Sequence, residues 1–316
     1  IWAGANVVGL GTGPFLAGAV SDATAWRWMF PPLTVLAAAT AVFGATRSRE
    51  VPGAAAAASD RAGQVLGTLG SVALVFAVIR GESSGWTSPL TTAGLAGGIA
   101  LLALFLFAER RAANPVFPPS LFAVRGFTAS AIAAAVALFT VIGIVFVFSI
   151  YLSARGVSDL GIAERLGCLF AGNAIASVVS GPLQTRLGSR PVLLGGLAVA
   201  AGGLAALLGA SSPQLGELAW RLLITGAGCG SVVASSTAVA VQSVAGPLAA
   251  KAGTANNVVR QLGGALGTAV IGGVFAASLS GGHSTLDAVH AGIVALLTVL
   301  IAAGAITTAL LARRRP

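Results

Sequence analysis

Charged residues are scarce in this chain. Lysine and arginine contribute 18 residues and aspartate and glutamate 9, so charged residues make up only 9% of the 316. Soluble domains carry about 25% charged residues, whereas here 56% of residues are hydrophobic and the mean hydropathy is +0.92. The composition therefore excludes a soluble globular domain and predicts a protein embedded in a lipid bilayer.

The chain lacks the residues that ATP binding, metal binding and common enzyme reactions require. The single lysine, Lys251, does not end a glycine-rich phosphate loop, which argues against direct coupling to ATP. His283, Asp287 and His290 have a spacing that could hold a metal on a helix, but an exposed polar loop explains the same residues. No zinc motif or serine/histidine pair is present. We therefore expect no enzyme, no metal and no cofactor.

Ten apolar runs recur along the chain. Crossing about 30 Å of hydrocarbon takes about 20 helical residues, and the runs lack the apolar/polar alternation of a membrane barrel. The predicted spans are 2–21, 29–46, 65–80, 90–108, 127–151, 165–183, 191–210, 220–244, 258–279 and 289–311. The predicted fold class is an all-α polytopic membrane protein with about ten transmembrane helices.

Acidic residues avoid the interior of these runs. A carboxylate at the centre of a span costs about 2.5 to 3.5 kcal/mol on insertion scales. All nine fall in predicted loops or at helix ends: Asp22, Glu50, Asp60, Glu82, Glu109, Asp159, Glu164, Glu217 and Asp287. We therefore expect no buried acid and no carboxylate proton relay within these spans.

Basic residues are unevenly divided between the two sides. If Ile1 is cytoplasmic, 13 of the 18 lie on the cytoplasmic side and 5 on the outer side. The positive-inside rule then predicts a multi-pass protein of the cell membrane with both termini in the cytoplasm. This topology explains the net charge of +9. No basic stripe with interleaved aromatic residues exists, so we expect no nucleic-acid partner.

The first span combines small residues with a proline. Ala5, Gly9, Gly13 and Ala17 recur every four residues, which leaves one helix face almost bare. Pro14 removes a backbone donor and is expected to bend or weaken the helix. The pattern predicts a close approach by another helix, although ordinary small-residue packing also explains an isolated stripe.

Two polar linkers divide the spans into blocks. Residues 47–62 are alanine-rich and charged, and residues 109–126 hold three prolines and three arginines. Residues 1–46 therefore hold two spans, residues 47–126 hold two further spans with the linkers, and residues 127–316 hold six. The blocks predict an incomplete bundle, a spacer pair and a complete six-helix bundle.

Motifs in the first block resemble those of the major facilitator superfamily. Gly9, Gly13, Pro14 and Gly18 are similar to the antiporter motif G-x-x-x-G-P-x-x-G-G of its fifth span, with alanine in place of one of the final glycines. Trp26–Phe30 resembles the W-R-W-x-F sequence that fourteen-span drug/proton antiporters carry in the next outside loop.

Two later segments extend the resemblance over nearly the whole chain. Gly181, Arg186, Gly188 and Arg190 resemble the C-terminal copy of the loop motif G-x-L-x-D-R-x-G-R-K, which here lacks its aspartate. Residues 256–267 are similar to a block in the family's thirteenth span. The chain is thus identified as a member of the fourteen-span drug/proton antiporters, and the major facilitator fold is implied.

The resemblance also implies which part of such a transporter is present. A fourteen-span protein entered at its fifth span leaves ten spans, the number found from hydropathy. Residues 1–46 would then complete the N-terminal six-helix bundle, and residues 127–316 would form the C-terminal one. The first four spans carry the family's proton-coupling groups, so we expect these missing N-terminal spans to be required for function and the chain alone not to transport.

The implied function is secondary active export. Two bundles would rock about a central site in alternating access, exchanging protons for a small amphipathic drug or antibiotic. A bulky residue at Gly13 is then expected to abolish efflux without abolishing insertion. Two alternatives stay open: another carrier of the superfamily, for a nutrient or metabolite, and a membrane scaffold without transport.

Candidate substrate contacts lie in the C-terminal spans, where a few hydrogen-bonding groups and aromatic rings interrupt the apolar surface, as in drug pockets. They are Phe139, Phe146, Phe148, Asn173, Gln242, Asn257, Arg260 and Gln261. Packing or lipid contact also explains aromatic residues in spans, and snorkelling to the lipid surface also explains Arg260. The identity of the substrate does not follow from the sequence.

Overall fold

A computed structural model describes residues 2–47, 61–112, 115 and 117–312; the side chains of residues 2–8, 10, 11, 26, 61, 62 and 82–84 are outside the described part. Ten α-helices and three short 3-10 helices form within these ranges, without any strand. The α-helices are α1 (Trp2–Ala23), α2 (Phe30–Arg47), α3 (Arg61–Ser84), α4 (Pro89–Arg111), α5 (Arg125–Ala154), α6 (Asp159–Leu187), α7 (Ser189–Leu207), α8 (Leu215–Gln242), α9 (Ala249–Ser280) and α10 (Thr285–Ala312). The 3-10 helices are η1 (Trp26–Met29), η2 (Pro119–Ala123) and η3 (Gly246–Leu248).

The all-helical prediction is confirmed, and each predicted span lies on one helix. Over their described residues, nine helices, α2 to α10, are long and apolar enough to cross a membrane. Helix α3 has 24 residues and extends four residues beyond the predicted span 65–80 at each end. Helix α9 begins at Ala249 rather than at residue 258, because Lys251, Asn256 and Asn257 lower the hydropathy of its first turns without preventing a helix.

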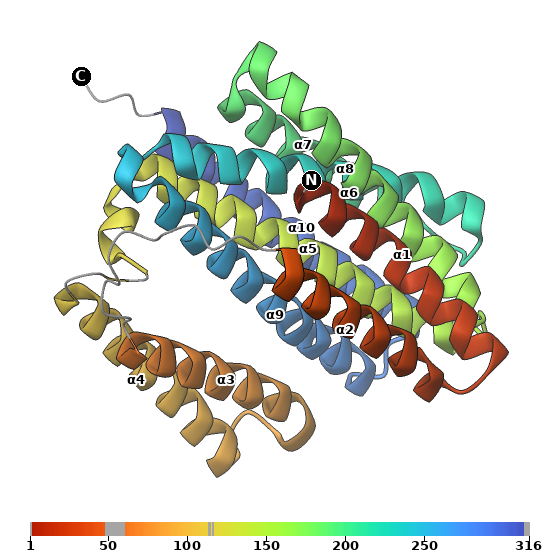
Figure 1. Cartoon of the computed structure of the whole chain (residues 1–316). Coiled ribbons are helices and arrows are strands. Elements are labelled where there is room, and N and C mark those ends of the chain that lie inside the picture. Colours follow the sequence, from red (N-terminus) through yellow and green to blue (C-terminus); the bar gives the residue numbers. More distant parts are fainter. Residues whose placement is uncertain (1, 48–60, 113–114, 116, 313–316) are drawn as a thin grey trace.

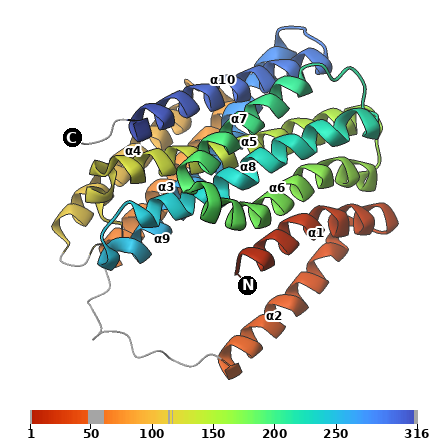
Figure 2. The ribbon, with the colours of Figure 1, turned by 90° about the horizontal axis from the view of Figure 1, so that it is seen from above.

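Helices α5 to α10 pack into one bundle (Figures 1 and 2). Within it, α8 contacts both α6 and α7, while α5 contacts α8, α9 and α10. The core is apolar and includes the fully buried Phe148, Leu193 and Leu222. The ring of Tyr151 packs edge-on against Phe148 with ring centroids 6.3 Å apart.

Glycines bring the backbones of this bundle together. A Cβ atom at Gly226 would overlap the carbonyl oxygen of Leu169 in α6, and one at Gly228 would overlap the backbone of Ala200 in α7. On α9, Gly263 and Gly267 meet the carbonyl oxygens of α5 in the same way. These glycines serve close helix packing, which is how TM helices without a hydrophobic driving force associate.

The pair α3 and α4 packs together beside the bundle (Figure 1). It reaches the bundle through contacts with α9 and through a series of aromatic rings, in which the centroids of Phe105 and Phe117 lie 5.9 Å apart. The expectation that no acid is buried is wrong for Glu109 at the end of α4. It is 1% exposed, and the backbone N–H of Phe117 donates to its Oε2 at 3.0 Å.

The turns between the helices lie at two opposite ends of the bundle. The turns after α1, α3, α5, α7 and α9 lie at one end, the Ser21 end, and the turns after α4, α6 and α8 lie at the other, the Arg125 end. Helix α1 packs along α6, whereas α2 contacts η1 and has no buried residue. Figure 2 shows α2 leaving the bundle at an angle to α1.

Replacing Gly226 by alanine tests the glycine contacts. The added methyl group must push α8 away from α6, and overpacking of this kind costs about 1–3 kcal/mol or more. We expect Gly226→Ala to lower the melting temperature of the purified protein by several degrees. Gly202→Ala is the matched control, because nothing lies within 4 Å of a Cβ atom there and alanine favours a helix. Equal melting temperatures for the two variants would contradict the packing account.

Candidate functional site

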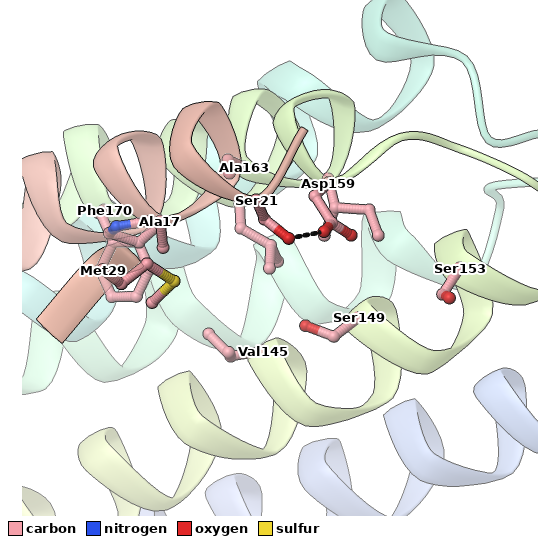
Figure 3. A pocket seen from close by; sticks show the side chains of 13 residues that line it. Ala17, Ser21, Met29, Val145, Ser149, Ser153, Asp159, Ala163 and Phe170 are labelled. Carbon is pink, nitrogen blue, oxygen red and sulfur yellow. Dashed lines mark hydrogen bonds between the residues drawn. The ribbon is translucent and has the colours of Figure 1, made fainter. Parts of the chain in front are cut away.

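An open pocket lies at the Ser21 end between α1, η1, α5 and α6 (Figure 3). Its volume is ≈ 440 Å³, within the usual range for small-molecule sites. The residues that line it are Pro14, Ala17, Gly18, Ser21, Met29, Val145, Ser149, Ser153, Asp159, Ile162, Ala163, Leu166 and Phe170. The walls are apolar apart from three serine hydroxyls and one carboxylate, which suits an amphipathic molecule.

Helix α1 reaches the bundle through one stripe of its surface. A Cβ atom at Gly18 would stand 2.8 Å from the carbonyl oxygen of Asp159 and 2.9 Å from the Cβ atom of Ala163. One turn earlier, the ring of Phe15 occupies the space over Gly167. Gly18 is buried, and any larger residue there would separate the two helices.

Polar contacts continue this stripe to the end of α1. The hydroxyl of Ser21 donates a hydrogen bond to Oδ2 of Asp159, drawn as a dashed line in Figure 3. The carboxylate of Asp22 accepts two hydrogen bonds, each 3.0 Å long, from the backbone N–H groups of Asp159 and Leu160. The last turn of α1 is therefore bonded to the first turn of α6, 137 residues further along the chain.

The residues of the antiporter motif divide into two groups in the structure. Pro14 and Gly18 line the pocket, and α1 stays helical through Pro14. Nothing described lies within 4 Å of a Cβ atom at Gly9 or Gly13, so the expected close approach of another helix is not met there. At 3.6 residues per turn, these two glycines lie on the side of α1 opposite to Gly18 and Asp22. The side chain of Ala5 is outside the described residues.

The residues of the loop motif form the turn between α6 and α7 at the Arg125 end. Gly188 has φ +88, a left-handed conformation that favours glycine. Its N–H donates a hydrogen bond to the backbone carbonyl oxygen of Gln184 at 2.9 Å. Arg186 and Arg190 are exposed on either side of the turn, and nothing lies within 4 Å of a Cβ atom at Gly181. The turn thus presents two exposed cations.

None of the eight candidate substrate contacts lines the pocket. Phe139 and Phe148 are buried in the bundle core, and Phe146 packs against that core. Asn173 is half-buried, with its backbone against Gly230 of α8. Gln242 and Gln261 are exposed. Arg260 donates to Oδ1 of Asn257, one turn earlier on α9.

Sequence reasoning missed the residues that do line the pocket. Ser149 and Phe170 are ordinary residues in apolar spans, and no local pattern distinguishes them. Ser153 and Asp159 lie outside the predicted spans, and Met29 lies at the start of one, within the W-R-W-x-F resemblance. The proline and glycine of α1 carried the one usable signal, because Pro14 and Gly18 lie at the pocket wall.

The described residues offer no metal centre. No group of three or more histidine, cysteine, aspartate or glutamate side chains among them could hold an ion. Ser284 and Asp287 instead cap the start of α10: the N–H of Ser284 donates to Oδ2 of Asp287 at 3.1 Å, and the N–H of Asp287 donates to Oγ of Ser284 at 3.2 Å. Cys168 and Cys229 are free thiols.

The sequence is similar to that of resistance proteins. It is 30% identical over 281 residues to the multidrug resistance protein Stp of Mycobacterium tuberculosis, covering 89% of this chain and 52% of Stp. It is 28% identical over 279 residues to the tetracenomycin C resistance and export protein of Streptomyces glaucescens, covering 86% of this chain and 51% of that protein. The chain thus spans about half the length of the curated relatives that it matches. No family model matches it.

The fold is similar to that of a solved transporter. A bacterial homologue of the human lysosomal transporter Spinster, crystallised in an inward-facing and occupied conformation, superposes with a TM-score of 0.52 and 16% identity. The match covers 80% of this chain and 67% of that chain. The uncharacterised MFS-type transporter Rv1250 of Mycobacterium tuberculosis is also similar, at 28% identity over 267 residues that cover 81% of this chain and 45% of that protein. The chain is therefore similar in sequence to drug- and antibiotic-resistance proteins of the major facilitator superfamily and similar in fold to a solved transporter.

Proposed function

We propose that the protein exports amphipathic small molecules, drugs or antibiotics, in exchange for protons. The observation that carries the proposal is the pocket between α1 and the α5–α6 pair, beside which α1 is bonded to the start of α6. A site between two helix groups that can part or close is what alternating access requires. The resistance functions in the names of the relatives support export rather than uptake.

The helix contacts support a division of the chain into two helix bundles and an extra helix pair. We propose that α1 and α2 belong to one bundle and α5 to α10 to the other, with α3 and α4 as an extra pair between them. In support, α1 meets the second group mainly through α6, while α5 to α10 contact one another extensively. The pair α3 and α4 touches the second group through α9 and η2.

The basic residues support an orientation for this state. Exposed arginines gather at the Arg125 end, among them Arg110, Arg111, Arg125, Arg186 and Arg190. We propose that this end faces the cytoplasm, following the positive-inside rule, in the cell membrane. The Ser21 end would then face outward, and its closure by α1 would make this the inward-facing state of the cycle.

The pocket chemistry supports the substrate class. Phe170, Leu166 and Val145 offer apolar surface, while Ser149 and Asp159 offer a hydroxyl and a carboxylate. Sites of this kind bind molecules with an apolar body and a few polar groups. We further propose that export needs spans equivalent to those that the relatives carry outside the matched region, because α1 and η1 alone form only one side of the pocket.

Transport by membrane vesicles tests the proposed function. Inside-out vesicles would contain either this chain or this chain preceded by the spans of Stp that lie outside the match, with insertion of each checked first. We expect uptake of tetracenomycin C only by the second protein, driven by an imposed pH gradient and abolished by a protonophore. Uptake that persists without the gradient would contradict proton antiport, and uptake by the first protein would contradict the need for further spans.

A pair of glycine variants tests the closure of the Ser21 end. In a Cys168→Ala, Cys229→Ala background, Ser21→Cys and Asp159→Cys should form a disulfide under mild oxidation. Adding Gly18→Leu should reduce the yield about tenfold, because overpacking of about 1–3 kcal/mol separates α1 from α6. The control is Gly13→Leu, which enters open space and should leave the yield unchanged.

The same two variants also test which glycine of the antiporter motif makes the contact between α1 and α6. Loss of the disulfide in Gly13→Leu, with retention in Gly18→Leu, would contradict the contact described here. Insertion should be normal in both variants, since leucine is favourable in a span.

A further inference from the structure

The start of α6 is capped from another helix. The first N–H groups of an α-helix have no partner within the helix, and in α6 these belong to Asp159, Leu160 and Gly161. Asp22 of α1 accepts from the first two at 3.0 Å each, and Ser158 accepts from the third at 3.2 Å. From Ile162 onward the regular helix bonds begin, with its N–H on the carbonyl oxygen of Ser158 at 2.9 Å.

Helix α10 at the same end of the bundle shows the ordinary arrangement. Its cap is local, because Ser284 and Asp287 satisfy each other's N–H groups within one turn. The cap of α6 instead comes from a residue 137 positions earlier. Two of its first three donors therefore have a partner within the protein only while α1 lies against α6.

We propose that Asp22 is a latch that holds the Ser21 end closed by capping α6. This inference rests on the proposed alternating-access cycle, in which α1 leaves α6 when that end opens. The carboxylate suits the task, since a helix N-terminus carries a partial positive charge that favours an anion. Ser21 strengthens the latch from the neighbouring position, because its hydroxyl bonds to the side chain of the same Asp159 whose N–H bonds to Asp22.

The surroundings make the latch reversible. Asp22 and Asp159 are exposed, so water can take over their hydrogen bonds when the helices part. The packing between helices inside the α5–α10 bundle differs from this contact, because backbone atoms there meet at buried positions. The contact between α1 and α6 thus combines exchangeable polar bonds with packing at two buried glycines, Gly18 and Gly167.

Spin labels measure the latch without relying on transport. In the protein that carries the full set of spans, with Cys168→Ala and Cys229→Ala, labels at Thr24→Cys and Glu164→Cys report the separation of α1 and α6 in bilayer discs. Both positions are exposed and neither lines the pocket. We expect one short separation with Asp22 present. Asp22→Asn keeps one acceptor oxygen and Asp22→Ala keeps none. The fraction of molecules with a longer distance between the labels should therefore rise in Asp22→Asn and rise further in Asp22→Ala. The expected increase is about 2- to 30-fold, the range for loss of a helix cap.

Asp287→Asn is the matched control, because it removes an aspartate that caps a helix at the same end but only its own helix. It should leave the separation as in the parent protein. A separation that is unchanged in both Asp22 variants, or changed equally by Asp287→Asn, would overturn the latch. Export by the parent protein is measured alongside: its absence would count against the proposed function, while the labels would still decide whether Asp22 holds the helices together.

Discussion

Close contact between backbones, made possible by glycine, is the constraint on which this structure depends. Lipid tails are as apolar as the side chains, so helices in a bilayer gain little from burying leucine and must gain from tight packing. Helix α8 meets this requirement on two sides: Gly226 and Gly230 admit the backbone of α6, and Gly228 admits that of α7. Helix α9 uses Gly263 and Gly267 in the same way against α5. These contacts fix α5 and α6, and thereby one wall of the pocket.

Helix α1 is held by a different kind of contact. It meets α6 through Phe15 and Gly18 and then through the polar groups of Ser21 and Asp22 at an exposed end. Glycine-packed pairs cannot separate without opening voids in a dense core, whereas exposed hydrogen bonds exchange with water at small net cost. The polar, exposed part of this contact is the feature on which the transport cycle proposed above relies.

Much of the fold could be predicted from the sequence, because each span must be apolar over its length and a glycine string must pack closely. The string Gly226, Gly228 and Gly230 is the clearest case. The pocket could not be predicted to the same extent. Its helices are apolar on all sides, so no periodic pattern tells which face of α5 points inward. Phe139 and Phe148 are candidate substrate contacts by residue type alone, and their rings lie in the bundle core.

The contact between Asp22 and α6 lies beyond any local pattern, because the partners are separated by 137 residues. Of the residues in the antiporter motif, Gly18 makes this contact, whereas nothing described lies within 4 Å of a Cβ atom at Gly9 or Gly13. A motif records which residues recur together, and only the packing shows which of them touch.

Hydrogen exchange at the first turn of α6 is the measurement that tests this account most directly. In bilayer discs and without substrate, the amides of Asp159 and Leu160 should exchange slowly, since both donate to Asp22 of another helix. Their exchange should quicken when a substrate and a proton gradient drive the cycle in vesicles. A different result would contradict closure of the pocket by α1. In that result, the amides of Asp159 and Leu160 exchange as fast in the resting state as those of the exposed turn 281–284, and substrate does not alter their rate.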